Sequence, residues 1–87
     1  MDKLKIDFTK HAEDMLKERN LEKKLIEETV FDPDWKEEKE EDIWHAFRRV
    51  GNKVLRVIVK GKEGSYKVIT MYYDRRIKDE AQSGYGK

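Results

Sequence analysis

The sequence predicts one α+β domain, with two N-terminal helices packed on one face of a curved antiparallel sheet. Three observations predict it. Apolar residues recur at helical spacing through residues 9–31, three strand-like runs follow from residue 43, and Gly51-Asn52 between the first two runs is a two-residue hairpin signal. The expected order is therefore β-α-α-β-β-β. A chain of 87 residues can bury one modest core. We assign residues 1–78 to this domain and residues 79–87 to a flexible C-terminal tail.

The first elements are a short strand and a capped helix. Apolar and charged residues alternate over residues 4–8, which predicts an edge strand. Thr9 is a plausible N-cap because its hydroxyl can accept from an amide of the first helical turn. Asn20 is placed where a helix would end in a left-handed residue, a conformation that Asn tolerates.

A second helix is expected from about Leu21 to Phe31, and Pro33 stops it. Its buried stripe consists of Leu21, Leu25, Ile26, Thr29 and Val30. Residues 32–42 then hold seven acids and two lysines. The simpler interpretation is a solvated connector. The alternative is an acidic flap that mimics RNA or orients a basic partner.

Three strands should follow, at about 43–50, 53–60 and 65–74. The Gly51-Asn52 turn sets Val50 opposite Lys53 and so assigns the side chains of the first two strands to two faces. The more apolar face, which should carry the helices, receives Trp44, Ala46, Leu55, Val57 and Val59, with Arg48 near the turn. The other face receives His45, Phe47, Arg49, Val54, Arg56 and Ile58.

The last strand admits two registers, because its turn could hold two or three residues. One register brings Met71 and Tyr73 to the face of His45 and Arg56. The other brings Thr70 and Tyr72 there, and we favour it because it sets Ile69 and Met71 against the helices.

Charge is divided unevenly along the chain. Residues 43–78 hold ten basic and two acidic side chains, a net charge of +8, whereas residues 1–42 hold nine basic and fifteen acidic ones, a net charge of −6. A basic sheet on a small protein favours an anionic partner, and RNA is the first candidate.

Composition excludes several classes. Without Cys there is neither a disulfide framework nor a thiolate metal site, and the spacing of His11 and His45 does not resemble a metal site. No phosphate loop, nucleotide fingerprint or nucleophile elbow is present, so no metal and no cofactor is expected. The N-terminus is polar and the longest apolar run is interrupted by Arg56, which predicts a cytoplasmic protein without a membrane span. Many charged residues and only three Asn or Gln resemble a thermophile's composition.

After these exclusions, the remaining candidate chemistry is cleavage of a phosphodiester without a metal ion. RNA cleavage needs a base, an acid and cations on the phosphate. The candidate catalytic residues are His11, His45, Arg56 and Tyr72. The phosphate candidates from charge are Arg49, Arg75 and Arg76.

Each candidate also has a structural interpretation. His11 could cap or pack a helix, and His45 could be a surface histidine. Arg56 within an apolar strand must either pair with a carboxylate or face an open groove, since a buried guanidinium is costly alone. The tyrosines suit strands, and Trp44 and Phe47 suit packing.

Several short motifs resemble a small, largely uncharacterised family of prokaryotic domains, similar in layout to RelE/ParE-type and BrnT-like toxins. They are Phe8-Thr9-Lys10-His11-Ala12, then Met15, Arg19-Asn20-Leu21, Val30 and Pro33, then Arg49-Val50, residues 55–59 and residues 68–72. The resemblance implies a RelE-like fold and an mRNA-cleaving toxin neutralised by an antitoxin.

By matching position, the resemblance carries over His11 and Arg19 from the helix motif, with Arg49, Arg56, Thr70 and Tyr72 from the strands. Asn20 stands where that family usually has Gly. The acidic stretch 32–42 obscures the alignment of the strand entry, and with it the assignment of His45.

The leading hypothesis is a toxin of a type II toxin–antitoxin system, acting as a metal-independent endonuclease on mRNA. The alternative is a noncatalytic module of the same fold that binds nucleic acid or protein. A third hypothesis is a homodimer formed by pairing of an exposed sheet edge.

Overall fold

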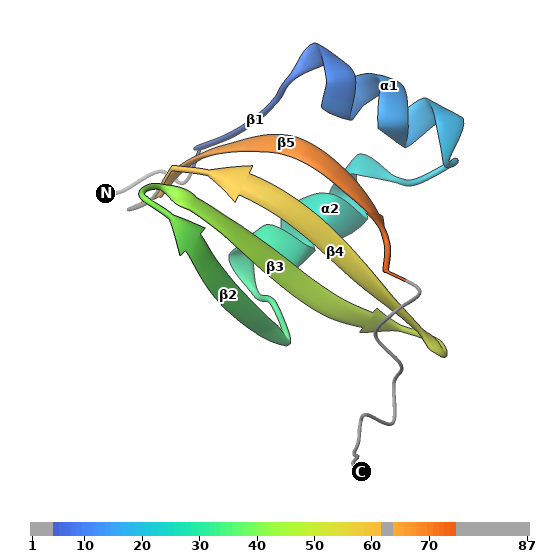
Figure 1. The fold of residues 1–87 in the computed structure, drawn as a ribbon. Helices are drawn as coiled ribbons and strands as arrows, with labels where there is room; N and C mark the ends of the chain where they lie inside the picture. The colour runs from blue at the N-terminus through green and yellow to red at the C-terminus, as the bar shows by residue number, and fades with distance from the viewer. Residues whose placement is uncertain (1–4, 62–63, 75–87) are drawn as a thin grey trace, which may run out of the picture.

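A mixed five-stranded sheet carries two helices in the computed structural model, which describes residues 5–61 and 64–74 (Figure 1). In chain order the elements are β1 (Lys5–Phe8), α1 (Lys10–Glu18), α2 (Lys23–Phe31), β2 (Trp35–Glu40), β3 (Ile43–Val50), β4 (Lys53–Lys60) and β5 (Ser65–Tyr73). The spatial order of the strands is β1-β5-β4-β3-β2. The predicted α+β class is confirmed, and so are the two helices between the first strand and the later strands.

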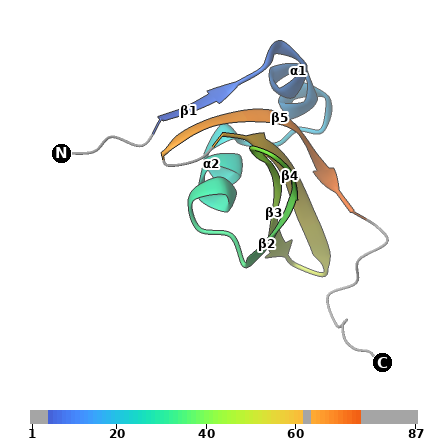
Figure 2. The same cartoon turned by 60° about the vertical axis from the view of Figure 1, so that its left-hand side comes forward.

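Both helices pack into one buried cluster. α2 lies against β3 and β4, and α1 lies against β5 and β1 (Figure 2). The cluster contains Ala12, Leu16, Ile26, Val30, Trp44, Ala46, Leu55, Val57, Val59, Val68 and Met71. It includes every residue that the hairpin register assigned to the apolar face except Arg48 near the turn. The predicted pairing is confirmed throughout, from Val50 opposite Lys53 to Ile43 opposite Lys60.

Thr9 joins the start of α1 to β5. Its hydroxyl accepts from the amide of Ala12 at 3.0 Å, as an N-cap does, and donates to the carbonyl of Ile69 at 3.1 Å. The Thr9 amide also donates to the Val68 carbonyl at 3.1 Å. The other end of the helix turns at Asn20, whose φ of 55° is the predicted left-handed conformation.

A β-bulge at Ile69 resolves the register of the last strand. Val59 faces Val68, but the next pair along β4 is Ile58 with Thr70, so Ile69 has no partner in β4. The extra residue lets Val68 and Met71 both point into the core, while Thr70 falls on the opposite face. The predicted faces of Thr70, Tyr72 and Met71 are confirmed. Ile69 is half-buried and lies outside the core cluster, contrary to the expectation that it would pack against the helices.

The acidic stretch holds a strand rather than only a connector. β2 forms the edge of the sheet and pairs with β3, beginning with Trp35 opposite Phe47. Its other residues are Lys and Glu, side chains that protect an exposed edge from pairing with other chains. The sheet is also mixed rather than antiparallel, because β1 runs parallel to β5. The prediction that residues 32–42 form only a connector is therefore wrong, because they contain β2. The prediction of a purely antiparallel sheet is also wrong, because β1 is parallel to β5.

The remaining expectations concern the membrane and the tail. Neither helix within the described residues has the length and apolar character needed to cross a bilayer. The predicted tail at 79–87 lies outside the described residues.

Replacing Thr9 should test its double role. We expect Thr9→Ala to lower the free energy of unfolding by about 1–2 kcal/mol, because both the cap and the bond to the bulge disappear. Thr9→Ser keeps the hydroxyl and should lose clearly less. Urea unfolding of the three proteins measures this, and equal losses in the two variants would show that the hydroxyl is not what matters.

Candidate nucleic-acid interface

The face of the sheet opposite the helices, here called the open face, collects most of the predicted site residues. Strand pairing aligns them in two rows that cross β2, β3, β4 and β5. One row is Trp35, Phe47, Arg56 and Tyr72, and the next is Glu37, His45, Ile58 and Thr70. The sequence assigned most of these side chains to one face, and the pairing confirms that assignment.

The aromatic rings of the first row stack on each other and on two guanidinium groups. The rings of Trp35 and Phe47 stack with centroids 4.9 Å apart and planes inclined by 4°. The Arg56 guanidinium lies 4.7 Å from the centroid of Phe47, and the Arg49 guanidinium lies 5.1 Å from that of Trp35. Phe47 is fully buried although no helix covers it, because its neighbours on the open face enclose it. Two cations and two rings thus form a continuous stack, in which Phe47 is enclosed and Arg49 is exposed at one end.

Arg56 also has a carboxylate partner. Its Nη2 lies 2.7 Å from Oδ2 of Asp74, and the two side chains are 13% and 2% exposed. Asp74 is held in place by its own amide, which donates to the Val54 carbonyl at 2.8 Å. Of the two interpretations left open for Arg56, pairing with a carboxylate is correct. The pair still borders the open face rather than lying beneath the helices.

His45 contacts the same guanidinium. Nη1 of Arg56 lies 3.0 Å from Nδ1 of His45. A guanidinium can only donate, so Nδ1 accepts and the neutral ring carries its proton on Nε2. Burial lowers the pKa of His45 below its usual value, and the positive charges of Arg56 and Lys39 lower it further, against a small opposing effect of Glu37.

This arrangement defines what the imidazole can do. With its lone pair engaged by Arg56, the neutral ring offers an N–H to a ligand, which suits a phosphate oxygen. Action as a general base requires the ring to release Arg56 and change tautomer. The resting geometry therefore favours binding of an anion, and proton transfer needs one rearrangement first.

Other predicted residues lie apart from this cluster. His11 and Arg19 are exposed in the first turn and at the C-cap of α1, and within residues 5–61 and 64–74 neither is hydrogen-bonded or ion-paired to His45 or Arg56. Arg75 and Arg76 lie outside the described residues. Arg49 is exposed and close to the cluster, since its amide donates to the Asp34 carboxylate at 2.7 Å. The role of all of these in RNA contact stays a prediction.

Two residues of the cluster escaped the sequence reasoning. Trp35 was passed over inside the acidic stretch, although a lone aromatic in a charged run is a signal in itself. Asp74 was counted only as one of two acids in a basic block. The cost of burying Arg56 required a carboxylate somewhere, and an acid ending the neighbouring strand was a candidate for it.

No group of three or more His, Cys, Asp or Glu within the described ranges is arranged to hold a metal ion.

A family model for a domain of unknown function, DUF4258, matches residues 8–73. The chain belongs to the DUF4258 family. No curated protein and no solved structure matches it. Membership in an uncharacterised domain family is thus confirmed, and no comparison links this DUF4258 domain to RelE, ParE or BrnT.

The lowered pKa of His45 predicts a pH-dependent stability. The unfolded chain binds the proton more readily than the folded one, so stability should be full above about pH 6.5 and fall as the pH decreases below it. His45→Asn keeps an acceptor near Nδ1 but does not titrate, so its stability should fall less between pH 7 and 5. Urea unfolding at several pH values measures both proteins.

A carboxylate, Glu37, affects stability in a separate pH range. A hydrogen bond from Lys39 lowers the pKa of Glu37 below its usual 4.5, and the stability this contributes is lost only at more acidic pH. Parallel curves for wild type and His45→Asn between pH 7 and 5 would contradict the lowered pKa of His45.

Proposed function

We propose that this DUF4258 domain binds single-stranded RNA on its open face. The observation that carries the proposal is the stack of two rings and two guanidinium groups on this face, with the Nε2–H of His45 beside it. The stack consists of Arg49, Trp35, Phe47 and Arg56. Single-stranded RNA is bound in this way by many proteins, with bases stacked on aromatic rings and guanidinium planes and with phosphates held by cations and N–H donors.

The charge around the open face supports an anionic ligand. Lys60 and Lys67 oppose each other across β4 and β5, on the same face as Ile58. Like charges in directly opposed positions repel, and a bound phosphate would relieve this repulsion. Asp7 faces Lys67 from β1 and offsets part of the charge at that edge. Arg49, whose guanidinium lies over the ring of Trp35, is exposed as well.

RNA binding should depend on Trp35. Replacing it by Ala removes the outer ring of the stack, and we expect the affinity for a fluorescein-labelled 12-nucleotide oligouridine to fall about tenfold, since a stacked base contributes about 1–3 kcal/mol. Arg49→Gln should weaken binding and reduce the salt dependence by about one phosphate contact. Fluorescence anisotropy at two salt concentrations gives both quantities.

Lys17→Gln, which removes an exposed charge from α1, is the matched control and should bind like wild type. An equal loss of affinity in the control would mean that net charge, and not the open face, attracts the RNA.

A second candidate is cleavage of mRNA by a toxin of a type II toxin–antitoxin system. Two observations favour it: the resemblance to RelE/ParE-type and BrnT-like toxins, and the meeting of an imidazole, a guanidinium and, in the same row, the phenol of Tyr72. In this proposal Arg56 stabilises the phosphate, while His45, once released, and Tyr72 transfer protons. A cognate antitoxin would neutralise the protein by covering the open face.

Cleavage is separable from binding. We expect wild-type protein to cut RNA, free or on ribosomes, in the presence of EDTA, and His45→Asn to reduce the rate by about a hundredfold or more while RNA affinity falls far less, because only one N–H donor to phosphate is lost. Tyr72→Phe should lower the rate with little change in binding. Gel assays with 5′-labelled RNA measure the rate. Intact RNA under all conditions would exclude the nuclease and leave the binding proposal standing.

A further inference from the structure

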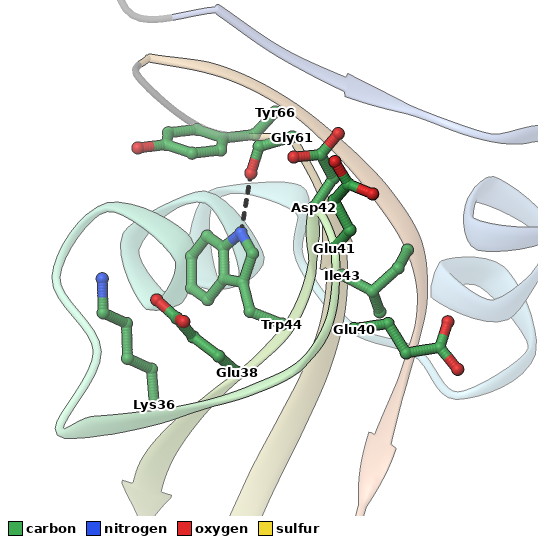
Figure 3. A pocket seen from close by; sticks show the side chains of 9 residues that line it. All are labelled: Lys36, Glu38, Glu40, Glu41, Asp42, Ile43, Trp44, Gly61 and Tyr66. Atoms are coloured by element: carbon green, nitrogen blue, oxygen red, sulfur yellow. Dashed lines mark hydrogen bonds between the residues drawn. The ribbon is translucent and has the colours of Figure 1, made fainter.

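A pocket opens on the opposite side of the sheet from His45, at the end where β2 turns into β3 (Figure 3). It has a volume of about 240 Å³. Its wall includes Lys36 and Glu38, which alternate with the open-face residues of β2, and Trp44, the residue before His45. Pockets for drug-sized ligands span about 300–1,000 Å³, so this volume suits a single side chain.

Aromatic rings line one part of this pocket. The indole of Trp44 is fixed by a bond from Nε1 to the Gly61 carbonyl at 2.9 Å. Tyr66 packs edge-on against it with centroids 5.6 Å apart, and Phe31 lies 6.0 Å beyond Tyr66. Among the described residues Phe31 is the one large apolar side chain that is exposed, at 39%. An exposed apolar side chain, Phe31, therefore lies beside the aromatic residues of the pocket.

One cation of the chain, the ammonium of Lys36, already contacts the aromatic side of the pocket. The ammonium of Lys36 lies over the Trp44 ring, 5.3 Å from its centroid. It forms no ion pair within the described residues, although Glu38 lies on the same side of the indole (Figure 3). The chain's own lysine thus shows that the indole face accepts a positive charge.

Most of the other lining residues are acidic. Glu38, Glu40, Glu41 and Asp42 all border the pocket. In the part of the chain that the structure describes, Glu38 and Glu41 form no ion pair, so their charge is available to a ligand. Carboxylates beside an aromatic face are the surroundings that a guanidinium prefers, because its plane can stack on the ring while its N–H groups reach the oxygens.

We propose that this pocket binds an arginine side chain from a basic peptide segment of a partner protein. The guanidinium stacks on Trp44 in place of the Lys36 ammonium and is bound by Glu38 and Glu41. An apolar residue beside the arginine contacts Phe31. This site is separate from the open face and does not depend on the RNA proposal.

The probe is the peptide acetyl-Gly-Leu-Arg-Leu-Gly-amide, compared with its citrulline version, which keeps the shape of arginine and removes the charge. The Trp35→Phe protein leaves Trp44 as the sole indole, so its fluorescence and its Nε1–H signal in NMR report on the pocket. We expect saturable changes with the arginine peptide and at least about tenfold weaker binding of the citrulline peptide.

Substitutions in the pocket should shift the affinity in opposite directions. The double variant Glu38→Gln with Glu41→Gln should bind the arginine peptide about fivefold more weakly. Lys36→Gln removes the competing cation and should bind about threefold more tightly. These side chains are exposed, so the substitutions leave the core intact. The matched control is Glu18→Gln with Glu28→Gln, exposed acids outside the pocket, and it should not change the affinity.

Any of these outcomes would overturn the proposal: equal binding of the arginine and citrulline peptides, an unchanged affinity of the double pocket variant, an equal loss in the control, or no response of Trp44. Saturable binding of free spermidine without binding of the peptide would also overturn it, because the site would then serve a small polyamine.

Discussion

The buried guanidinium of Arg56 is the constraint around which the open face is arranged. A cation that is 13% exposed needs a partner, and Asp74 supplies it at 2.7 Å. Removing one member of such a pair costs about 3–5 kcal/mol, a large part of the 5–15 kcal/mol that stabilises a typical domain. Replacing both members of a buried ion pair by apolar side chains of similar volume is, by contrast, often neutral or stabilising. Stability alone therefore does not explain an arginine here, whereas presenting a positive charge and orienting an imidazole does.

The bulge at Ile69 makes this arrangement compatible with the core. Upstream of it, Val68 points toward the helices, and an uninterrupted strand would send Thr70 the same way. One extra residue reverses the alternation, so Met71 enters the core and Tyr72 stands opposite Arg56. The hydroxyl of Thr9 bonds to the carbonyl at that bulge. The start of α1 and the alignment of the open face are thus fixed at the same point.

Elements that depend on local turn and cap signals could be predicted from the sequence, whereas elements that depend on long-range contacts could not. Gly51-Asn52 determined eight residue pairs, and Thr9 and Asn20 bounded α1, because turn and cap preferences act over a few residues. β2 was missed because its Lys and Glu residues have low strand propensity, and only stacking of Trp35 on the distant Phe47 marks its start. The Ile69 bulge and the Asp74 partner depend on contacts that no local pattern encodes.

The uneven charge along the chain acquires a spatial meaning in this sheet. β2 brings the acidic stretch alongside β3, so Glu37 stands directly opposite His45. Its carboxylate is engaged by Lys39 at 2.9 Å and still faces the side from which an anion would approach. The middle of β2 is therefore less favourable for an anion than the area over β4 and β5, where Lys60 and Lys67 lie. In the RNA-binding proposal, Trp35 at the start of β2 therefore suits a base, whose ring can stack on the indole, better than a phosphate.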